Sequence, residues 1–371
     1  MSRLRFVVVA PTIDGMHAVE GSKSVFHGGD SYREMAESVL APHGEVSHLG
    51  WEPGSPLEER IETLDAVLPG ADGLITTPWL NLTELAVPTF DEARLRRAST
   101  LKVIAGTHDF RLGWIDLDAA TEHGVVVVDT SRTMTPTVAE YGVAVTLALL
   151  RDIPGAIDLV RSGGWMHGME GGRYVFRDLA ECRVGLAGYG SINRHYRRFI
   201  QPYGCPVHAF DPMLDDHVFA TDDVTRSGSL VELARESDIF VVAIPPTPST
   251  LRVVGASVID ALPRGALFVL LSRMAVLDQD ALWRRVRAEE IRAAIDVFDP
   301  EPPPDDAWFR RAANVLPTPH IAGNVRFAHE RCFREACADA VRVLRGERPR
   351  HAALIRDKQL YDGTLPTPSS I

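Results

Sequence analysis

The sequence has few cysteines, no long apolar stretch and no signal-like start, and so lacks the features of disulfide-rich, membrane-spanning and secreted proteins. Its four cysteines, Cys182, Cys205, Cys332 and Cys337, form no Cys-x-x-Cys pair and no metal-like cluster, so we expect reduced thiols rather than a disulfide framework. No apolar stretch approaches the roughly 18 residues of a membrane-spanning helix. The opening residues Met1–Arg5 lead directly into a predicted strand and lack the pattern of a signal sequence. We therefore expect a cytoplasmic protein that does not bind a membrane.

Basic residues are also fewer than acidic residues. The chain has 39 lysine and arginine residues against 50 aspartate and glutamate residues, which gives a formal net charge of −11. Nucleic acids and anionic membranes attract basic surfaces, so this balance argues against either partner. There is no internal repeat and no low-complexity block. The length of 371 residues, with 45% hydrophobic and 24% charged residues, is typical of a soluble enzyme with two domains.

Short apolar runs alternate with helical patterns along the chain. This alternation predicts an α/β protein with two doubly wound parallel-sheet units. The predicted strands are residues 5–10, 73–76, 102–105, 125–128, 183–187, 207–210, 239–243, 266–271, 293–297 and 315–316. The predicted helices include residues 31–40, 57–66, 137–152 and 191–201. Pro154 is expected to end or bend the third of these helices.

A glycine pair, Gly188 and Gly190, stands between a predicted strand and a predicted helix. Such glycines let the chain turn tightly and bring backbone N–H groups and the positive end of the helix against a pyrophosphate. The next predicted strand ends in Asp211, at about the 20-residue distance of an acid that binds a ribose diol. This carboxylate would repel a 2′-phosphate, which favours NAD over NADP. Asn193 replaces the usual third glycine, and we expect a slightly displaced helix there.

A glycine pair alone could form any tight turn. The strand before it, the helix after it and the acid at the right distance together carry the prediction of a dinucleotide site.

Three polar residues far apart in the chain, Arg273, Glu301 and His320, each follow an apolar run. An imidazolium is well suited to give a proton to a carbonyl oxygen during its reduction. The planar guanidinium of an arginine suits a substrate carboxylate. Taken singly, each residue could equally be a surface cation, a loop carboxylate or a strand terminus. Asp299, which lies close to Glu301 in the sequence, is a second carboxylate that could pair with the histidine.

Residues from about 101 to 345 resemble the D-isomer-specific 2-hydroxyacid dehydrogenase family, which contains phosphoglycerate, glyoxylate/hydroxypyruvate and D-lactate dehydrogenases. The motifs that agree in order and spacing are Val184–Gly190, Ile244–Thr250, Leu271–Arg273, Asp296–Pro302 and Thr318–Gly323. The resemblance implies that His320 is the acid/base, that Glu301 is its carboxylate partner and that Arg273 grips the substrate. It also implies that Asp296 accepts a hydrogen bond from the nicotinamide carboxamide.

The same resemblance implies an architecture and a set of cofactor contacts. A Rossmann NAD-binding domain, residues 131–318, would be inserted in a flavodoxin-like substrate domain made of residues 1–130 and 319–350, with 351–371 as a tail. Family members commonly pair through the dinucleotide domain, so we expect a homodimer that uses the helix at 137–152. The implied contacts to NAD (NADH) are Gly188, Gly190, Ser191, Ile192, Asp211, Ile244, Pro245, Thr250, Ser272, Asp296 and Gly323.

Departures from the family concern the substrate. The loop Gly106–Asp116 is longer than the family's compact loop, whose backbone amides hold the substrate carboxylate. His108 and Arg111 could supply side-chain donors instead, or could simply face solvent. Trp79 could roof the pocket or pack in the core. Histidines at 17 and 27 lie in a long first loop, but no carboxylate or cysteine spacing supports a metal site there.

The leading functional prediction is an NAD-dependent enzyme that interconverts a 2-keto acid and a D-2-hydroxy acid. Two alternatives remain open. A dehydrogenase of a non-carboxylate anion such as phosphite retains an Arg/Glu/His set. An NAD(H)-sensing, corepressor-like binding protein shares the fold and much of the active site, although the acidic balance gives it no obvious partner surface.

Overall fold

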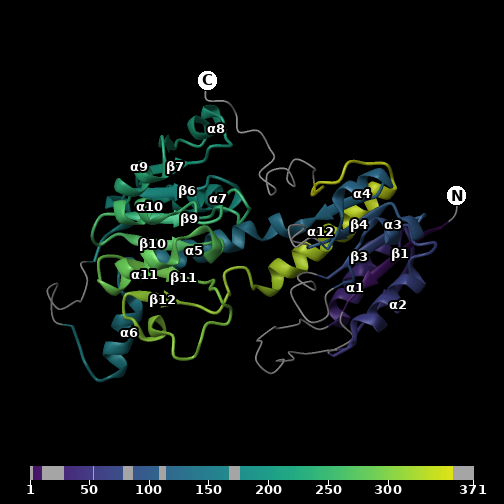
Figure 1. Cartoon of the computed structure of the whole chain (residues 1–371), viewed down its shortest axis with the longest axis horizontal. Coiled ribbons are helices and arrows are strands. Elements are labelled where there is room, and N and C mark those ends of the chain that lie inside the picture. Colours follow the sequence, from purple (N-terminus) through teal and green to yellow (C-terminus); the bar gives the residue numbers. More distant parts are fainter. Residues whose placement is uncertain are drawn as a thin grey trace. The chain divides into compact units, whose positions relative to one another are not determined.

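The computed structural model describes residues 3–10, 29–52, 54–77, 87–107, 114–166 and 176–353. These residues form two compact units (Figure 1). The first unit contains the described residues up to Met134 and those from Val325 onward, and the second contains Thr135–Asn324. Each unit is built on one parallel sheet, of five strands in the first and seven in the second. The predicted α/β fold class is therefore confirmed.

The first unit has the strand order β2-β1-β3-β4-β5. Its strands are β1 (Leu4–Val9), β2 (Gly44–Leu49), β3 (Gly73–Thr76), β4 (Val103–Gly106) and β5 (Val126–Asp129). Its helices are α1 (Gly29–Leu40), α2 (Leu57–Val67), α3 (Glu92–Arg97), α4 (Leu117–Glu122) and α12 (Arg326–Leu344), with the 3-10 turn η3 (Thr130–Met134). Every residue of β3 and β4 is buried, as expected for strands covered on both faces.

Helices cover both faces of this sheet. Phe6 of β1 packs with Phe333 of α12 and with the apolar residues of α1. The next residue, Val7, packs on the other face with Leu64 of α2 and Leu95 of α3. Because successive side chains of a strand point to opposite faces, the continuous apolar run of β1 fills two cores at once.

The chain after α12 returns to the edge of the sheet. Asp339 of α12 is fully buried, and its carboxylate accepts the backbone N–H groups of Arg350 at 3.0 Å and His351 at 2.8 Å. Ala352 then pairs antiparallel with Val128 of β5. Residues 350–353, which we call the return segment, are thus held beside β5.

The second unit has the strand order β12-β11-β10-β9-β6-β7-β8. Its strands are β6 (Val184–Ala187), β7 (Val207–Phe210), β8 (Thr225–Arg226), β9 (Ile239–Val242), β10 (Leu267–Leu270), β11 (Arg292–Ile295) and β12 (Val315–Pro317). Its helices are α5 (Thr135–Leu150), α6 (Ile153–Arg161), α7 (Ser191–Ile200), α8 (Asp216–Thr221), α9 (Leu230–Arg235), α10 (Ala256–Ala261) and α11 (Gln279–Arg287). The chain order reverses between β6 and β9, and such a switch point is where doubly wound sheets bind ligands.

This sheet too is covered on both faces. Phe240 of β9 packs with Leu233 of α9 and Leu282 of α11. Its neighbour Val241 packs on the other face with Leu149 of α5 and Ile200 of α7. The carboxyl ends of the strands are therefore left as the edge at which loops can hold a ligand.

One sequence expectation about apolar length is wrong. Thr130–Leu150 is helical over 21 residues with a mean hydropathy of 1.2, so it is long and apolar enough by length and composition to cross a membrane. A core helix passes the same test. Within α5, Ala139, Val145 and Leu149 belong to the core of the second unit, which accounts for their apolar character.

Candidate active site

The candidate residues of the second unit follow the carboxyl ends of neighbouring strands. Strand pairing aligns the last residues of these strands in one row: Phe210, Ala187, Val242, Leu270, Ile295 and Pro317. The candidates follow that row within three residues: Asp211, Gly188, Ile244, Ser272, Arg273, Asp296 and His320. The fold therefore brings residues from distant parts of the sequence to one edge of the sheet.

His320 and Glu301 form a pair at this edge. Nδ1 of His320 lies 2.9 Å from Oε1 of Glu301, and the two side chains are 40% and 35% exposed. Of the two carboxylates that the sequence offered, the structure pairs Glu301 with the histidine. A proton on Nδ1 that is donated to Glu301 fixes the tautomer and leaves Nε2 to exchange a proton with a ligand.

Asp296 is hydrogen-bonded to the backbone of His320 and of the two residues after it. His320 has a left-handed backbone with φ of 53°, and its N–H donates to the main-chain oxygen of Asp296 at 2.9 Å. The Asp296 carboxylate accepts the N–H groups of Ile321 at 2.9 Å and Ala322 at 2.8 Å. A left-handed residue other than glycine costs about 1 kcal/mol, so these bonds help to hold a conformation that the chain would otherwise leave.

The Asp296 side chain is only 2% exposed. Burial raises the pKa of Asp296, because the charged form loses its hydration. Hydrogen bonds from Thr318 and from the amides of Ala322 and Ile321 oppose this shift without cancelling it.

Arg273 stands at the end of β10, the strand next to β11. Its backbone is extended, with φ of −145° and ψ of 150°, and it precedes the 3-10 turn η6 (Met274–Val276). Its Nη1 donates to the carbonyl oxygen of Ser272 at 2.9 Å. Leu271, Ser272 and Met274 are buried around it, so the position of its backbone is fixed by the core.

The glycine pair lies between β6 and α7. Gly188 has φ of 76°, and a Cβ there would lie 3.0 Å from Cγ1 of Ile244, so both the backbone and the neighbouring strand end require glycine. At Gly190 the φ of −77° suits any residue, and a Cβ would meet no heavy atom of the described residues within 4 Å. None of these described atoms requires glycine there. The open space beside the N-terminus of α7 is where backbone N–H groups would hold a pyrophosphate.

Asn193 occupies the place of the third glycine without blocking the turn. Its side chain is fully buried, and Nδ2 donates to the carbonyl oxygens of Ala187 at 3.2 Å and Gly188 at 2.6 Å. The amide thus ties α7 to the end of β6. Within the described residues, its Oδ1 is buried without a hydrogen-bond partner.

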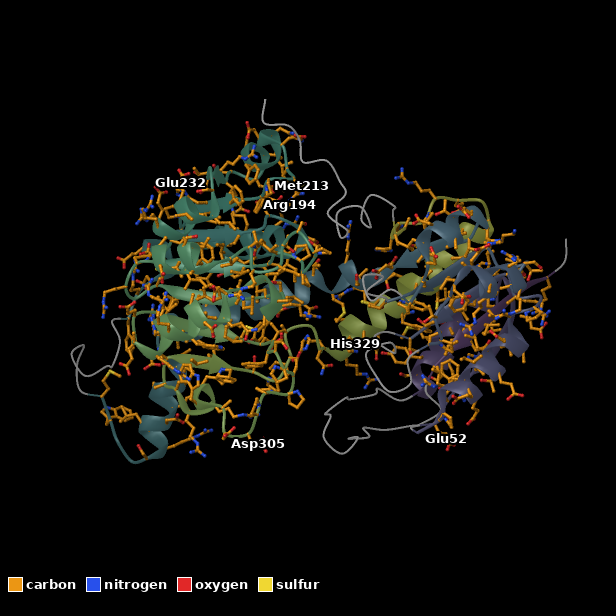
Figure 2. All side chains as sticks on the ribbon, viewed as in Figure 1. Glu52, Arg194, Met213, Glu232, Asp305 and His329 are labelled. Carbon is orange, nitrogen blue, oxygen red and sulfur yellow. The ribbon has the colours of Figure 1, made fainter. Side chains whose placement is uncertain are left out.

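Asp211 is fixed by backbone groups. One carboxylate oxygen accepts the N–H of Tyr189 at 2.9 Å, and the other accepts the N–H of Met213 at 2.9 Å; Met213 is labelled in Figure 2. A carboxylate has about four lone-pair sites, so each oxygen can accept one further bond. The side chain is therefore oriented in advance for a diol.

The remaining candidate contacts lie on the same loops. Oγ1 of Thr250 donates to the carbonyl oxygen of Pro245 at 2.5 Å, which closes the loop that begins at Ile244. Within the described residues, Oγ of Ser272 is buried without a hydrogen-bond partner. Oγ of Ser191 lies 2.9 Å from that of Thr135, while Ile192 packs in the core. Gly323 directly follows Ala322. An orphan hydroxyl, an open glycine cradle and an oriented carboxylate all fit a dinucleotide.

Sequence reasoning missed two residues of this network. Tyr141 of α5 and Thr318 are hydroxyl-bonded at 2.5 Å, and Thr318 donates to Asp296 at 2.6 Å. Thr318 belongs to the Thr-Pro-His motif, but no pattern in the sequence joins Tyr141 to it. The proposed substrate contacts Trp79, His108 and Arg111, and also the histidines at 17 and 27, lie outside the described residues.

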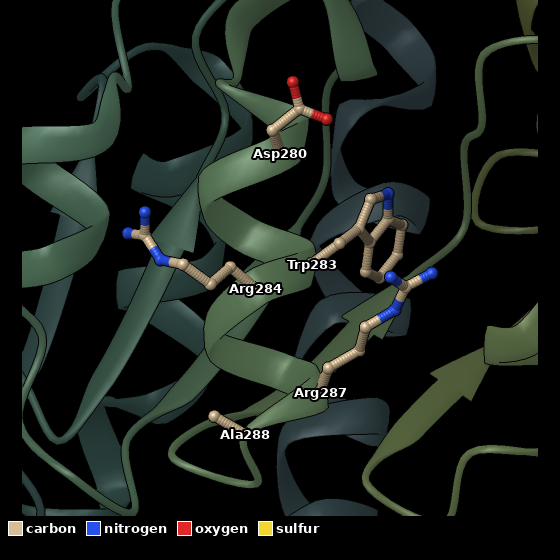
Figure 3. A pocket seen from close by; sticks show the side chains of 5 residues that line it. All are labelled: Asp280, Trp283, Arg284, Arg287 and Ala288. Atoms are coloured by element: carbon tan, nitrogen blue, oxygen red, sulfur yellow. The ribbon is translucent and has the colours of Figure 1, made fainter.

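A separate surface pocket lies along α11. It has a volume of about 490 Å³ and is lined by Asp280, Trp283, Arg284, Arg287 and Ala288. Trp283 and Arg287 lie on one side of the helix and Arg284 on the other (Figure 3). None of the lining residues follows the carboxyl end of a strand. This pocket is therefore not part of the candidate active site.

Residues 143–322 match the model of the D-isomer specific 2-hydroxyacid dehydrogenase NAD binding domain. D-3-phosphoglycerate dehydrogenase of Methanocaldococcus jannaschii is 29% identical over 319 residues, which are 86% of this chain and 57% of that protein. The enzyme of that name from Mycobacterium tuberculosis is 28% identical over 315 residues, 85% of this chain and 56% of that protein. The chain spans little more than half the length of these relatives.

Solved structures match over nearly the whole chain. A phosphoglycerate oxidoreductase from Rhizobium etli has a TM-score of 0.73 and 25% identity, and covers 95% of this chain and 97% of its own. Apo D-mandelate dehydrogenase from Rhodotorula graminis has a TM-score of 0.73 at 20% identity, covers 95% of this chain and 98% of its own, and shows the shared fold. The resemblance read from the sequence motifs is confirmed. Residues 143–322 thus match the NAD binding domain of the D-isomer specific 2-hydroxyacid dehydrogenase family, the family that the sequence motifs resemble.

Proposed function

We propose that this protein is an NAD-dependent oxidoreductase that interconverts a 2-keto acid and a D-2-hydroxy acid. The observation that carries the proposal is the His320–Glu301 pair, with 2.9 Å between Nδ1 and Oε1, at the strand edge that also carries the glycine turn. A histidine oriented by a carboxylate is a general acid and base. The edge of the sheet at a switch point is the place for a dinucleotide.

The chemistry divides between the cofactor and the chain. NADH, when bound, supplies the hydride for the carbonyl carbon. Nε2–H of His320 donates its proton to the carbonyl oxygen, which becomes the hydroxyl group, and in the reverse direction the neutral ring accepts that proton. Glu301 holds the ring and stabilises its charged form. Arg273 offers two parallel N–H groups to the substrate carboxylate, which fixes the keto carbon beside it.

Asp211 supports the choice of NAD over NADP. Its two oxygens are already oriented by the N–H groups of Tyr189 and Met213, each at 2.9 Å. The remaining lone pairs suit the two hydroxyls of a ribose, and a 2′-phosphate would meet a like charge. We further propose that Asp296, whose Oδ2 accepts only Ala322 N among the described contacts, accepts the carboxamide N–H at that oxygen.

The test is NADH consumption with a panel of 2-keto acids, from glyoxylate through hydroxypyruvate to phenylpyruvate and dicarboxylates. His320→Ala is the informative variant. His208→Ala is its matched control, because His208 is also paired with a glutamate in this unit, 3.6 Å from Glu236, away from the carboxyl edge. Turnover that is lost in His320→Ala and retained in His208→Ala would support the proposal.

Other outcomes would redirect it. Undiminished turnover in His320→Ala would refute the acid/base role. Tight NADH binding without turnover of any keto acid would point to an NAD(H)-sensing binding protein. NAD reduction with phosphite, and no reaction with hydroxy acids, would point to a non-carboxylate substrate.

We also propose a homodimer. The helix at 137–152, expected to form its interface, corresponds to α5, which places Ala139, Val145 and Leu149 in the core of the second unit. The support comes instead from the next helix, α6. No residue of α6 is buried, and Ile153, Ile157 and Val160 are 45%, 43% and 55% exposed. Their spacing places them on one face of the helix, and a second copy of this chain would cover it. Light scattering at micromolar concentration should give twice the chain mass of 40.7 kDa, and Ile157→Asp should shift it toward the monomer.

Two further proposals concern organisation and location. The second unit would bind the cofactor, as its match to the NAD binding domain supports, and the first would contribute substrate contacts. A cytoplasmic location is supported by the four free cysteines. Fractionation of cells that express the protein would test the location.

A further inference from the structure

A chain of hydrogen bonds leads from α5 to the backbone of His320. The Tyr141 hydroxyl lies 2.5 Å from Oγ1 of Thr318, and Thr318 donates to Oδ1 of Asp296 at 2.6 Å. Asp296 in turn accepts the N–H groups of Ile321 and Ala322. The chain joins residues that are 177 positions apart in the sequence.

The direction of each bond follows from the groups involved. The Asp296 carboxylate can only accept, so the single hydroxyl proton of Thr318 goes to it. The Thr318 oxygen must then accept the proton of Tyr141. Burial raises the pKa of Tyr141, which keeps the hydroxyl protonated and available as a donor at neutral pH.

Asp296 holds the histidine loop from two sides. Its main-chain oxygen accepts the N–H of His320 at 2.9 Å, while its carboxylate accepts the next two N–H groups, those of Ile321 and Ala322. His320 itself is left-handed, with φ of 53°. The orientation of the Asp296 carboxylate therefore determines whether His320 keeps the backbone that places Nδ1 on Glu301.

We propose that Tyr141 and Thr318 are positioning residues for His320, which act by orienting the Asp296 carboxylate that holds the histidine loop. The proposal rests on the proposed acid/base role of His320. Neither residue needs to touch substrate or cofactor. Loss of the Tyr141 hydroxyl leaves Thr318 free to rotate, and loss of the Thr318 hydroxyl leaves Asp296 with one donor fewer.

The same helix offers a matched control. Tyr196 is fully buried, and its hydroxyl lies 2.9 Å from Oγ1 of Thr146 on α5. Tyr196→Phe therefore removes a tyrosine–threonine bond from α5, as Tyr141→Phe does, without a connection to Asp296. Any effect through general loosening of α5 should appear in both variants.

The first measurement is amide hydrogen exchange of the full-length protein, followed by mass spectrometry of the peptide that contains residues 318–324. We expect exchange of the His320, Ile321 and Ala322 amides to quicken about five-fold in Tyr141→Phe and more in Thr318→Val, because a lost hydrogen bond of this kind changes an equilibrium by about that factor. Tyr196→Phe should leave this peptide unchanged. Because no substrate is present, the result does not depend on whether the proposed reaction is correct.

The second measurement is steady-state kinetics with the best keto acid. We expect kcat to fall about five-fold in Tyr141→Phe, with KM and the Kd for NADH within about two-fold of the parent, and Thr318→Ser to restore the loss seen in Thr318→Val. The double variant Tyr141→Phe/Thr318→Val should match Thr318→Val alone, since Tyr141 acts through Thr318.

Additive losses in the double variant, or equal effects of Tyr196→Phe, would overturn the positioning role. Parent-like exchange and kinetics in Tyr141→Phe would do so too. Absence of turnover in the parent protein, with the exchange pattern as expected, would instead refute the proposed function and leave the hydrogen-bond chain in place.

Discussion

Each unit buries an aspartate that accepts backbone N–H groups, and the surroundings of the two carboxylates differ. Asp339 in the first unit contacts Arg342 and lies 2.9 Å from Nδ1 of His351. Asp296 in the second unit accepts from the Thr318 hydroxyl and from two amides. Both side chains are almost fully inaccessible, at 0% and 2% exposure. The donors differ: Asp339 accepts from the Arg342 guanidinium, a histidine ring and two backbone amides, whereas Asp296 accepts from one hydroxyl and two backbone amides.

The pKa values move in opposite directions as a result. Burial raises the pKa of Asp339, but bonds from His351, Arg350 and Arg342 outweigh it and lower the pKa to about 2. For Asp296, burial raises the pKa and the neutral donors do not reverse it. The carboxylate that fastens two segments has a guanidinium among its donors, whereas the described donors to the carboxylate beside the candidate site are a hydroxyl and two amides.

The largest effect is expected at the second unit's site. His320→Ala should lower turnover about 100-fold or more, because the proton donor is lost, while the Kd for NADH and the unfolding midpoint stay close to the parent values. Arg273→Ala should lower kcat/KM by a similar factor through loss of the carboxylate grip. Stopped-flow and thermal unfolding measurements would check both. A large drop in stability in His320→Ala would contradict a purely chemical role.

The next effect falls on the first unit and on stability alone. Asp339→Asn should lower the free energy of unfolding by about 2 kcal/mol at neutral pH, since the folded state lowers the pKa of Asp339 from 3.8 to about 2. In the parent this contribution is complete above about pH 4 and is lost as the pH falls toward 2. Urea unfolding across this pH range would measure it. Glu122→Gln, at an exposed position of α4, serves as the control and should change little.

A smaller effect is expected at the cofactor. Asp211→Ala should raise the Kd for NADH about ten-fold, the value of lost hydrogen bonds to a charged group, and should narrow the difference between NADH and NADPH. Fluorescence titration with both cofactors would show it. Equal affinity of the parent for the two cofactors would argue against Asp211 as the discriminating group.

The smallest expected effect is the contribution of Asp296 to the pH dependence of stability, which is opposite in sign to that of Asp339. Because the folded state raises the pKa of Asp296, this group contributes stability below its ordinary pKa that is lost as the pH rises above 3.8. For Asp296 the free energy of unfolding falls as the pH rises, whereas for Asp339 it rises. Asp296→Asn should remove the Asp296 contribution, and unfolding of the variant and the parent between acid and neutral pH would measure this. A variant with the parent's slope would show that Asp296 titrates normally.

The sequence predicted strands that contain a mostly apolar run. The predicted strand at 5–10 corresponds to β1 (Leu4–Val9), and that at 239–243 to β9 (Ile239–Val242). It missed β2 (Gly44–Leu49), because this strand lies at a sheet edge and carries polar residues such as Glu45 and Ser47 that interrupt the apolar run. Pro154 is expected to end or bend the helix at 137–152. That helix, α5, ends at Leu150, and Pro154 lies in the first turn of α6, where its fixed φ is tolerated.

For the candidate site, the sequence pattern could indicate which residues follow the ends of strands, but not which other side chains hold those residues in position. Gly188, Asp211 and His320 each follow a recognisable apolar run. Tyr141 does not, because its role depends on how α5 packs against the loop after β12. Nor could the sequence tell that Asn193 would place its amide on the carbonyls of Ala187 and Gly188. Contacts made by tertiary packing leave no periodic signal.

The return segment has a consequence for solubility. β5 is the edge strand of its sheet, and without the return segment its outer edge would expose unpaired backbone groups that another protein chain could pair with. Asp129 N–H donates to the carbonyl oxygen of His351, and Ala353 N–H donates to that of Val127, both at 2.9 Å. These bonds occupy part of that edge. We therefore expect Asp339, by holding the return segment, to limit edge-to-edge aggregation, and a chain cut before Arg350 to aggregate more readily.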